Sequence, residues 1–152
     1  MRIAVLLFCA AALMFAAPQS DEKDVVAVVQ RLFDALAAHD GDAITSLMIP
    51  GGRLVAVRDN GATATAPEDF AARLKTIDKP MLERMWNPKT LVHGRIAVVW
   101  AEYDFHLDGK FMHCGIDSVN LVKTAGNWKI AAIVYTAETT DCAPSPLGPP
   151  KE

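Results

Sequence analysis

The sequence has no cluster of lysine and arginine residues and little excess charge of either sign. Its 152 residues include 15 basic and 18 acidic side chains, which gives a net charge of −3 at pH 7. Proteins that bind nucleic acid or an anionic membrane surface usually carry a basic patch, because phosphate groups provide much of the binding energy. We therefore expect neither nucleic acid nor a membrane surface as a partner.

Common metal-binding and catalytic motifs are also absent. The sequence contains no H-E-x-x-H motif, no group of closely spaced cysteines, no G-x-S-x-G turn and no glycine-rich phosphate loop. Glu102, Asp104 and His106 alternate along one predicted strand, but charged alternation of this kind is typical of a solvated strand face. We therefore predict no metal site and no cofactor.

Only one long hydrophobic run is present, at residues 3–17, and it follows Met1-Arg2. It is shorter than the ~20 residues that a membrane-spanning helix requires. Small residues near position 20 offer cleavage sites before the charged residues begin. This pattern predicts a secretory signal peptide at residues 1–20 and a secreted or periplasmic protein that has no membrane contact after cleavage.

Cysteine is scarce, with three residues in the whole chain. Cys9 lies in the predicted signal peptide, so export leaves Cys114 and Cys142, which allow a single intramolecular pair. An oxidising compartment favours a Cys114–Cys142 disulfide, and two free thiols are the alternative. Residues 139–152 are rich in proline and poor in apolar residues, so we predict a disordered tail there.

The first half of the mature chain predicts helices. Apolar residues between Val25 and Leu36 recur at spacings of three and four, which indicates an amphipathic helix that begins near Asp21. Asp42 is expected to cap a short second helix, and Pro67 opens a third. A first strand is predicted at residues 54–57.

The second half predicts antiparallel strands joined by short turns that contain glycine. The expected strands cover residues 81–93, 95–107, 111–123 and 128–137. Residues 21–138 should therefore form one α+β domain, in which three N-terminal helices pack on one face of a curved antiparallel sheet.

Asp117 is unusual because an acidic residue stands in the middle of a predicted strand. In strand 95–107 the odd-numbered residues are apolar and should face the core. If Asp108-Gly109 is a two-residue turn, odd residues oppose even ones and Asp117 faces outward. If a three-residue loop with a bulge joins the strands, Asp117 faces the core opposite Val99. The turn residues permit both registers.

The element order and two sequence tracts resemble a known superfamily. The tracts are V-V-Q-R-L-F-D-A-L-A-A-H-D-G-D-A-I-T-S-L-M at residues 28–48 and H-C-G-I-D-S-V-N-L-V-K-T-A-G-N-W-K-I at residues 113–130. They resemble the nuclear transport factor 2-like superfamily, which includes ketosteroid isomerases, SnoaL-type cyclases and secreted lumazine-binding-like proteins, the last being most similar. The resemblance covers nearly all of residues 22–138. It implies a cone-shaped sheet with the helices on its concave face, and it favours the register in which Asp117 faces inward.

The resemblance also implies candidate catalytic residues. In the isomerase branch an aspartate at the position of Asp117 is kept protonated and donates a hydrogen bond to the substrate oxyanion, and a second aspartate, here Asp59, acts as the base. The tyrosine that completes the isomerase site would stand at Leu32, so Tyr103 would have to supply the phenol. An isomerase or cyclase that uses Asp59 and Asp117 is therefore one hypothesis.

The leading hypothesis is a cup that binds a small apolar or aromatic molecule. An ionised, unpaired Asp117 in such a cup would be costly, so we expect it to be protonated or paired. The candidate ligand-binding residues are Tyr103, Phe105, His113, Asp117, Val119 and Val134, with further walls from Phe33, Leu36, Met48, Phe70 and Met85. A scaffold with a filled interior is the third hypothesis.

The predicted outer face of the sheet carries apolar residues that a monomer would expose, namely Val98, Trp100, Ile116, Ile133 and Tyr135. Such a patch indicates a homodimer formed through this face, which the resemblance also implies. Burial of Trp100 and Tyr135 under the tail is the alternative.

Overall fold

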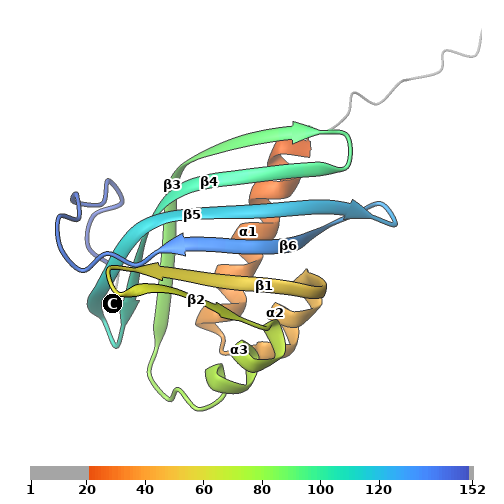
Figure 1. Cartoon of the computed structure of the whole chain (residues 1–152). Helices are drawn as coiled ribbons and strands as arrows, with labels where there is room; N and C mark the ends of the chain where they lie inside the picture. Colours follow the sequence, from red (N-terminus) through yellow and green to blue (C-terminus); the bar gives the residue numbers. More distant parts are fainter. Residues whose placement is uncertain (1–20, 151–152) are drawn as a thin grey trace, which may run out of the picture.

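The computed structural model describes residues 21–150, and the predicted signal peptide lies outside the described residues. These residues form three helices and one six-stranded sheet, whose arrangement is drawn in Figure 1. In chain order the elements are α1 (Asp21–Ala37), α2 (Gly41–Leu47), β1 (Met48–Arg58), β2 (Gly61–Thr65), α3 (Pro67–Leu74), β3 (Met81–His93), β4 (Ile96–Leu107), β5 (Lys110–Thr124) and β6 (Asn127–Thr136). None of the helices in residues 21–150 combines the length and apolar character needed to cross a membrane.

The helices form where the sequence predicts them. The apolar stripe of α1 is buried, as its three-and-four spacing requires. Asp40, and not the predicted Asp42, caps α2 by accepting a hydrogen bond from Ala43 N at 2.8 Å. Pro67 occupies the first turn of α3. The buried residues of α1 are Val25, Val28, Val29, Leu32, Phe33, Ala35 and Leu36.

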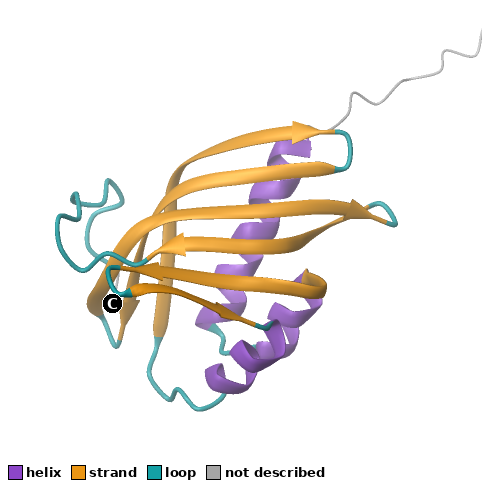
Figure 2. Cartoon of the chain, viewed as in Figure 1, coloured by secondary structure: helices purple, strands orange, loops and turns teal. Residues whose placement is uncertain are grey.

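The sheet is open, with the strand order β2-β1-β6-β5-β4-β3. Figure 2 shows the helices on one side of this curved sheet. The predicted α+β fold, with three helices on the concave face, is confirmed. The prediction of an entirely antiparallel sheet is wrong at one position, because β1 and β6 pair in parallel. After β1 the chain passes through β2 and α3 to the opposite edge of the sheet, where β3 lies. Strands β3 to β6 then follow one another back toward β1, each antiparallel to the one before. The last of them, β6, therefore runs in the same direction as β1.

The turn between β4 and β5 combines parts of both predicted registers. Leu107 pairs with Lys110 across a two-residue turn, as in the first alternative, but a register shift follows at once and leaves Met112 as an extra residue in β5. Beyond this bulge odd residues oppose odd ones, as in the second alternative. Asp117 therefore faces the concave side, although its partner is Ala101 and not the predicted Val99.

A second bulge changes the facing of β6. Its register against β5 shifts at Ala131, so that Ile130 and Ile133 are both buried although three positions separate them. Tyr135 then also faces the concave side, and Val134 faces outward with 37% of its surface exposed. The prediction that Ile133 and Tyr135 lie on the outer face is therefore wrong, and so is the placement of Val134 among the cavity residues.

The C-terminal residues 139–150 contain no helix or strand, but they lie against the convex face of the sheet, whereas the sequence predicted disorder there. A disulfide joins Cys114 on β5 to Cys142. Arg84 on β3 donates a hydrogen bond to the carbonyl oxygen of Gly148 at 2.9 Å. This segment covers the end of the convex face where Asp104 is buried, and it leaves Trp100 half exposed.

Candidate functional site

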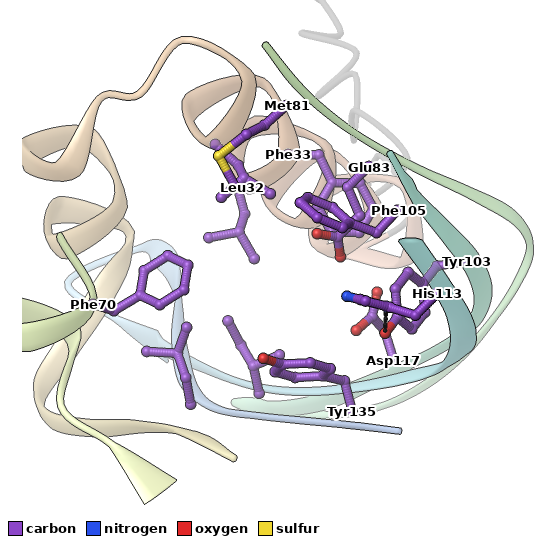
Figure 3. Close-up of a pocket in the computed structure, with 13 residues that line it drawn as sticks. Leu32, Phe33, Phe70, Met81, Glu83, Tyr103, Phe105, His113, Asp117 and Tyr135 are labelled. Carbon is purple, nitrogen blue, oxygen red and sulfur yellow. Dashed lines mark hydrogen bonds between the residues drawn. The ribbon is translucent and has the colours of Figure 1, made fainter. Parts of the chain in front are cut away.

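A cavity of about 180 Å³ lies between the helices and the concave face of the sheet. Figure 3 shows the thirteen residues that line it, most of which are apolar or aromatic. The walls come from α1, α3 and five of the six strands. The lining residues are Leu32, Phe33, Leu36, Leu54, Phe70, Met81, Glu83, Tyr103, Phe105, His113, Asp117, Ile133 and Tyr135.

The polar side chains gather at one end of the cavity, where β3, β4 and β5 lie next to one another. Glu83 comes from β3, Tyr103 from β4, and His113 and Asp117 from β5. They meet because strand pairing places Glu83 beside Phe105 and Tyr103 opposite Gly115, with all inward residues on one face.

Glu83 is the functional candidate that the sequence analysis missed. Its carboxyl group is hydrogen-bonded to that of Asp117. The sequence could have predicted that Glu83 points to the concave side, because it stands between Met81 and Met85 at alternate positions of the strand.

The two carboxyl groups share a proton near neutral pH. Burial raises the pKa of Asp117 to about 7, and the hydrogen bond with Glu83 offsets part of that rise. Burial, and then the charge of Asp117, raise the pKa of Glu83 well above its usual range. Two adjacent buried carboxylates cannot both be ionised at acceptable cost, so Glu83 is the protonated partner and donates to Asp117. Asp117 Oδ2 has no hydrogen-bond partner among the described residues.

His113 presents a hydrogen-bond acceptor to the cavity. Tyr103 Oη lies 2.6 Å from the carbonyl oxygen of Thr136 and 3.0 Å from His113 Nδ1. The carbonyl can only accept, so the phenol donates to it, and His113 Nδ1 must carry the proton and donate to the phenol oxygen. Burial, and then the charge of Arg58, lower the pKa of His113, so the ring is neutral at pH 7. Nε2 is therefore an unprotonated acceptor, and Figure 3 shows a ring nitrogen directed toward the cavity.

Gly115 allows this arrangement. A Cβ atom at this position would overlap the carbonyl oxygen of Thr136, and the backbone φ of +157° is rarely adopted by other residues. The same close approach lets Thr136 Oγ1 accept a hydrogen bond from Ile116 N at 3.0 Å. The end of β6 therefore lies against β5, which brings Thr136 to Tyr103.

Comparison with known proteins identifies the family. The sequence matches the family model described as "Putative lumazine-binding" over residues 20–136. The chain belongs to this family. The predicted resemblance to the nuclear transport factor 2-like (NTF2-like) superfamily is confirmed by this match and by solved structures of that superfamily. No curated protein matches the chain.

The solved structures that are similar to this lumazine-binding-family protein share its fold at low sequence identity. A protein of unknown function from Mycobacterium tuberculosis is 16% identical with a TM-score of 0.68, over 78% of this chain and 72% of that chain. An NTF2-like protein of unknown function from Pseudomonas putida is 12% identical with a TM-score of 0.67, over 82% of this chain and 97% of that chain. An NTF2-like protein of unknown function from Silicibacter pomeroyi is 16% identical with a TM-score of 0.61, over 78% and 96%. At these identities the similarity shows the fold alone.

The candidate residues of this lumazine-binding-family protein do not all meet at the cavity. Tyr103, Phe105, His113 and Asp117 line it. Val119 is fully buried in the core and does not line it, and Val134 is on the opposite face. Among the additional predicted walls, Phe33, Leu36 and Phe70 line the cavity, whereas Met48 and Met85 pack in the core instead.

Asp59 is separated from the other catalytic candidate. It is exposed in the turn between β1 and β2 and does not line the cavity, because the hairpin carries it beyond the end of the sheet. Asp59 and Asp117 are therefore not brought together. The phenol hydrogen of Tyr103 is also committed to Thr136, so Tyr103 does not offer a free donor to a ligand.

Glu102, Asp104 and His106 lie on the convex face, away from the cavity. Arg84 binds Asp104 through two hydrogen bonds, one of them 2.9 Å long, and Trp86 Nε1 donates to Glu102 at 2.7 Å. Within residues 21–150 no three side chains are arranged to hold a metal ion.

Proposed function

We propose that this lumazine-binding-family protein binds a small, largely apolar or aromatic molecule in the concave cavity, with Asp117 as the polar anchor. One observation carries the proposal: a mostly apolar cavity ends in a buried carboxyl pair, in which Asp117 Oδ2 has no hydrogen-bond partner among the described residues. A core that served only to stabilise the fold would gain nothing from two buried acids, because burying them is costly.

The polar end also supports a particular hydrogen-bonding pattern in the ligand. The Glu83–Asp117 pair can accept a hydrogen bond through Asp117, and His113 Nε2 can accept another. We infer a ligand that has at least one N–H or O–H donor on an apolar or aromatic body. A fused heterocycle such as lumazine, which the family description names, has N–H groups of this kind on a flat ring.

Binding is better supported than the isomerase or cyclase alternative. That reaction requires a base that removes a carbon-bound proton and a donor that stabilises the resulting enolate. Asp59 is exposed outside the cavity, and Tyr103 donates to the backbone. The scaffold hypothesis is disfavoured because the interior contains an open cavity.

We further propose that the protein is exported to the periplasm or beyond. The short apolar run at residues 3–17, preceded by Arg2 and followed by small residues, supports a cleaved signal peptide. The Cys114–Cys142 disulfide agrees with an oxidising compartment.

A homodimer formed through the convex face is also part of the proposal. Apolar side chains that are well exposed in the single chain lie on or beside this face, and a second copy could cover them. They are Leu91, Ile96, Trp100 and Val134, which are 75%, 59%, 50% and 37% exposed.

Native mass spectrometry of the purified protein, followed by calorimetric titration with lumazine, tests the binding proposal. We expect a bound small molecule in the spectrum, and we expect Asp117→Asn to weaken lumazine binding by about tenfold or more, equivalent to ~1.4 kcal/mol. Asp59→Asn is the matched control and should bind as the wild type does. Unchanged affinity in Asp117→Asn, or the absence of any bound molecule together with no lumazine binding, would contradict the proposal.

A further inference from the structure

A second chamber adjoins the cavity on the side of β1, β2 and α3. It has a volume of about 310 Å³, and it shares four lining residues with the cavity: Leu54, Phe70, Met81 and Tyr135. A ligand longer than the inner cavity could therefore extend past Phe70 into this outer chamber without crossing a polar barrier.

The outer chamber has a cationic lining. Arg58 stands at the end of β1 and Arg73 on α3, and no acidic residue lines the chamber. Arg73 donates a hydrogen bond to Thr65 Oγ1 at 3.1 Å. Neither arginine takes part in any of the ion pairs formed among residues 21–150. The chain as a whole has a net charge of −3, so this chamber is a local exception. Two arginines that line it without a carboxylate would attract an anionic ligand.

The charge of Arg58 also acts on the inner cavity. It contributes to the lowered pKa of His113 after burial, and it offsets part of the rise that burial causes in the pKa of Tyr135. The inner end, by contrast, contains Glu83 and Asp117 and would repel a second negative charge. An anionic ligand can therefore bind in one orientation only, with its charge at the arginines.

We propose that the ligand is an organic anion whose carboxylate or phosphate group binds between Arg58 and Arg73, while its apolar body extends past Phe70 toward Asp117. This inference rests on the proposed binding function and adds the chemical class and the orientation of the ligand. The guanidinium groups can each form paired hydrogen bonds to such an oxyanion, and the hydroxyl of Thr63 lies in the same chamber.

Three probes with similar apolar bodies, each with a phenolic hydroxyl that can donate to Asp117, test the inference: 4-(4-hydroxyphenyl)butanoate, its neutral amide 4-(4-hydroxyphenyl)butanamide, and 3-(4-hydroxyphenyl)propyl phosphate. Calorimetry at pH 7.5 should show that at least one anion binds the full mature protein about tenfold or more tightly than the amide does. The preference should shrink in 0.5 M salt, because the arginines are exposed to solvent. Comparison of the two anions distinguishes a carboxylate site from a phosphate site.

Charge-removing variants locate the site. Arg58→Gln and Arg73→Gln should each lower the affinity for the preferred anion by about tenfold and leave the affinity for the amide nearly unchanged. Arg95→Gln is the matched control, because Arg95 is an exposed arginine that lines neither chamber. Circular dichroism verifies that each variant is folded.

The outcomes separate this inference from the binding function on which it rests. If the amide binds as well as both anions, or if neither arginine variant weakens the anion, the inference is wrong. If Asp117→Asn weakens all probes in that case, the binding function stands alone. If none of the three probes binds, the result counts against both.

Discussion

The Glu83–Asp117 pair should make the stability of the fold depend on pH. Burial raises both pKa values in the folded state above the ordinary values of 4.5 and 3.8. A carboxyl group whose folded pKa is raised contributes its full stability below the unfolded pKa and loses it as the pH rises through the folded value. The relevant window therefore extends from about pH 4 to above the value of about 7 for Asp117.

Urea unfolding at a series of pH values measures this effect. Between pH 4 and pH 8 the free energy of unfolding should fall by an amount on the order of 4 kcal/mol, from a rise of three pKa units at 1.36 kcal/mol each. Asp117→Asn should reduce this dependence, since asparagine cannot ionise, while burial still raises the pKa of Glu83 and preserves its share. Asp59→Asn should retain the full dependence. A wild-type profile in Asp117→Asn would show that the pair does not titrate as described.

The polar residues of the cavity could be predicted from the sequence only in part. Asp117 is conspicuous in the sequence because an acid stands among the apolar residues of a strand, whereas Glu83 is not, because polar and apolar residues are mixed on both sides of it in β3. The hydrogen-bonded partner of Tyr103 is a backbone carbonyl in β6, at a separation of 33 positions. No side-chain pattern in the sequence encodes such a contact.

At the scale of elements, Gly115 should be the least replaceable position of β5. Gly115→Ala is expected to destabilise the protein by about 2–4 kcal/mol, because its Cβ would overlap the carbonyl of Thr136 and force β5 and β6 apart. The measurement is chemical denaturation, with loss of the Tyr103–His113 contact checked by NMR of the imidazole.

Gly94→Ala provides the matched control for that prediction. Gly94 also has a positive φ, of +57°, but an added Cβ there would meet no atom within 4 Å. Gly94→Ala should therefore lower the free energy of unfolding by only about 1 kcal/mol, the usual penalty for alanine in this backbone conformation. Equal losses in the two variants would mean that the close approach of Thr136 contributes nothing.

Helices and strands differed in how well the sequence predicted them. α1 was predicted well, because its apolar residues repeat with the helical period along the whole element. The strands were found, but the side of the sheet to which each residue points depended on single extra residues, Met112 in β5 and Ala131 in β6. A bulge leaves no periodic signal, yet it moves every later side chain to the other face. β2 was missed because its alanine and threonine residues, although they alternate, include no large apolar side chain that would mark a buried face, and nearly all of them are exposed.

At the scale of the whole molecule, the disulfide should hold the C-terminal segment on the sheet. The two cysteines are 28 positions apart. Replacing both Cys114 and Cys142 with serine should lower the free energy of unfolding by about 3.5 kcal/mol on the loop-entropy estimate. Hydrogen exchange should also become fast in residues 143–150. An unchanged urea midpoint with protected tail amides would show that the other tail contacts suffice.

The proposed dimer gives a further prediction at this scale. Trp100→Glu should convert the protein to monomers in sedimentation velocity experiments, because a charge in the centre of an apolar interface would be desolvated. Leu147→Glu is the control, since Leu147 is equally exposed, at 50%, but lies on the tail. A wild-type protein that sediments as a monomer would remove the dimer from the proposal.

The position of β6 between β1 and β5 has a consequence for how the chain folds. β6 is the last strand to be synthesised, yet it joins the β1–β2 hairpin to the rest of the sheet, with Leu54 paired to Ile133. Pairings between such distant positions form slowly. Until residues 127–136 have been synthesised, the β1–β2 hairpin has no strand that links it to β5, β4 and β3. The β1–β2 hairpin of the nascent protein should therefore remain open to proteases and chaperones until β6 is available.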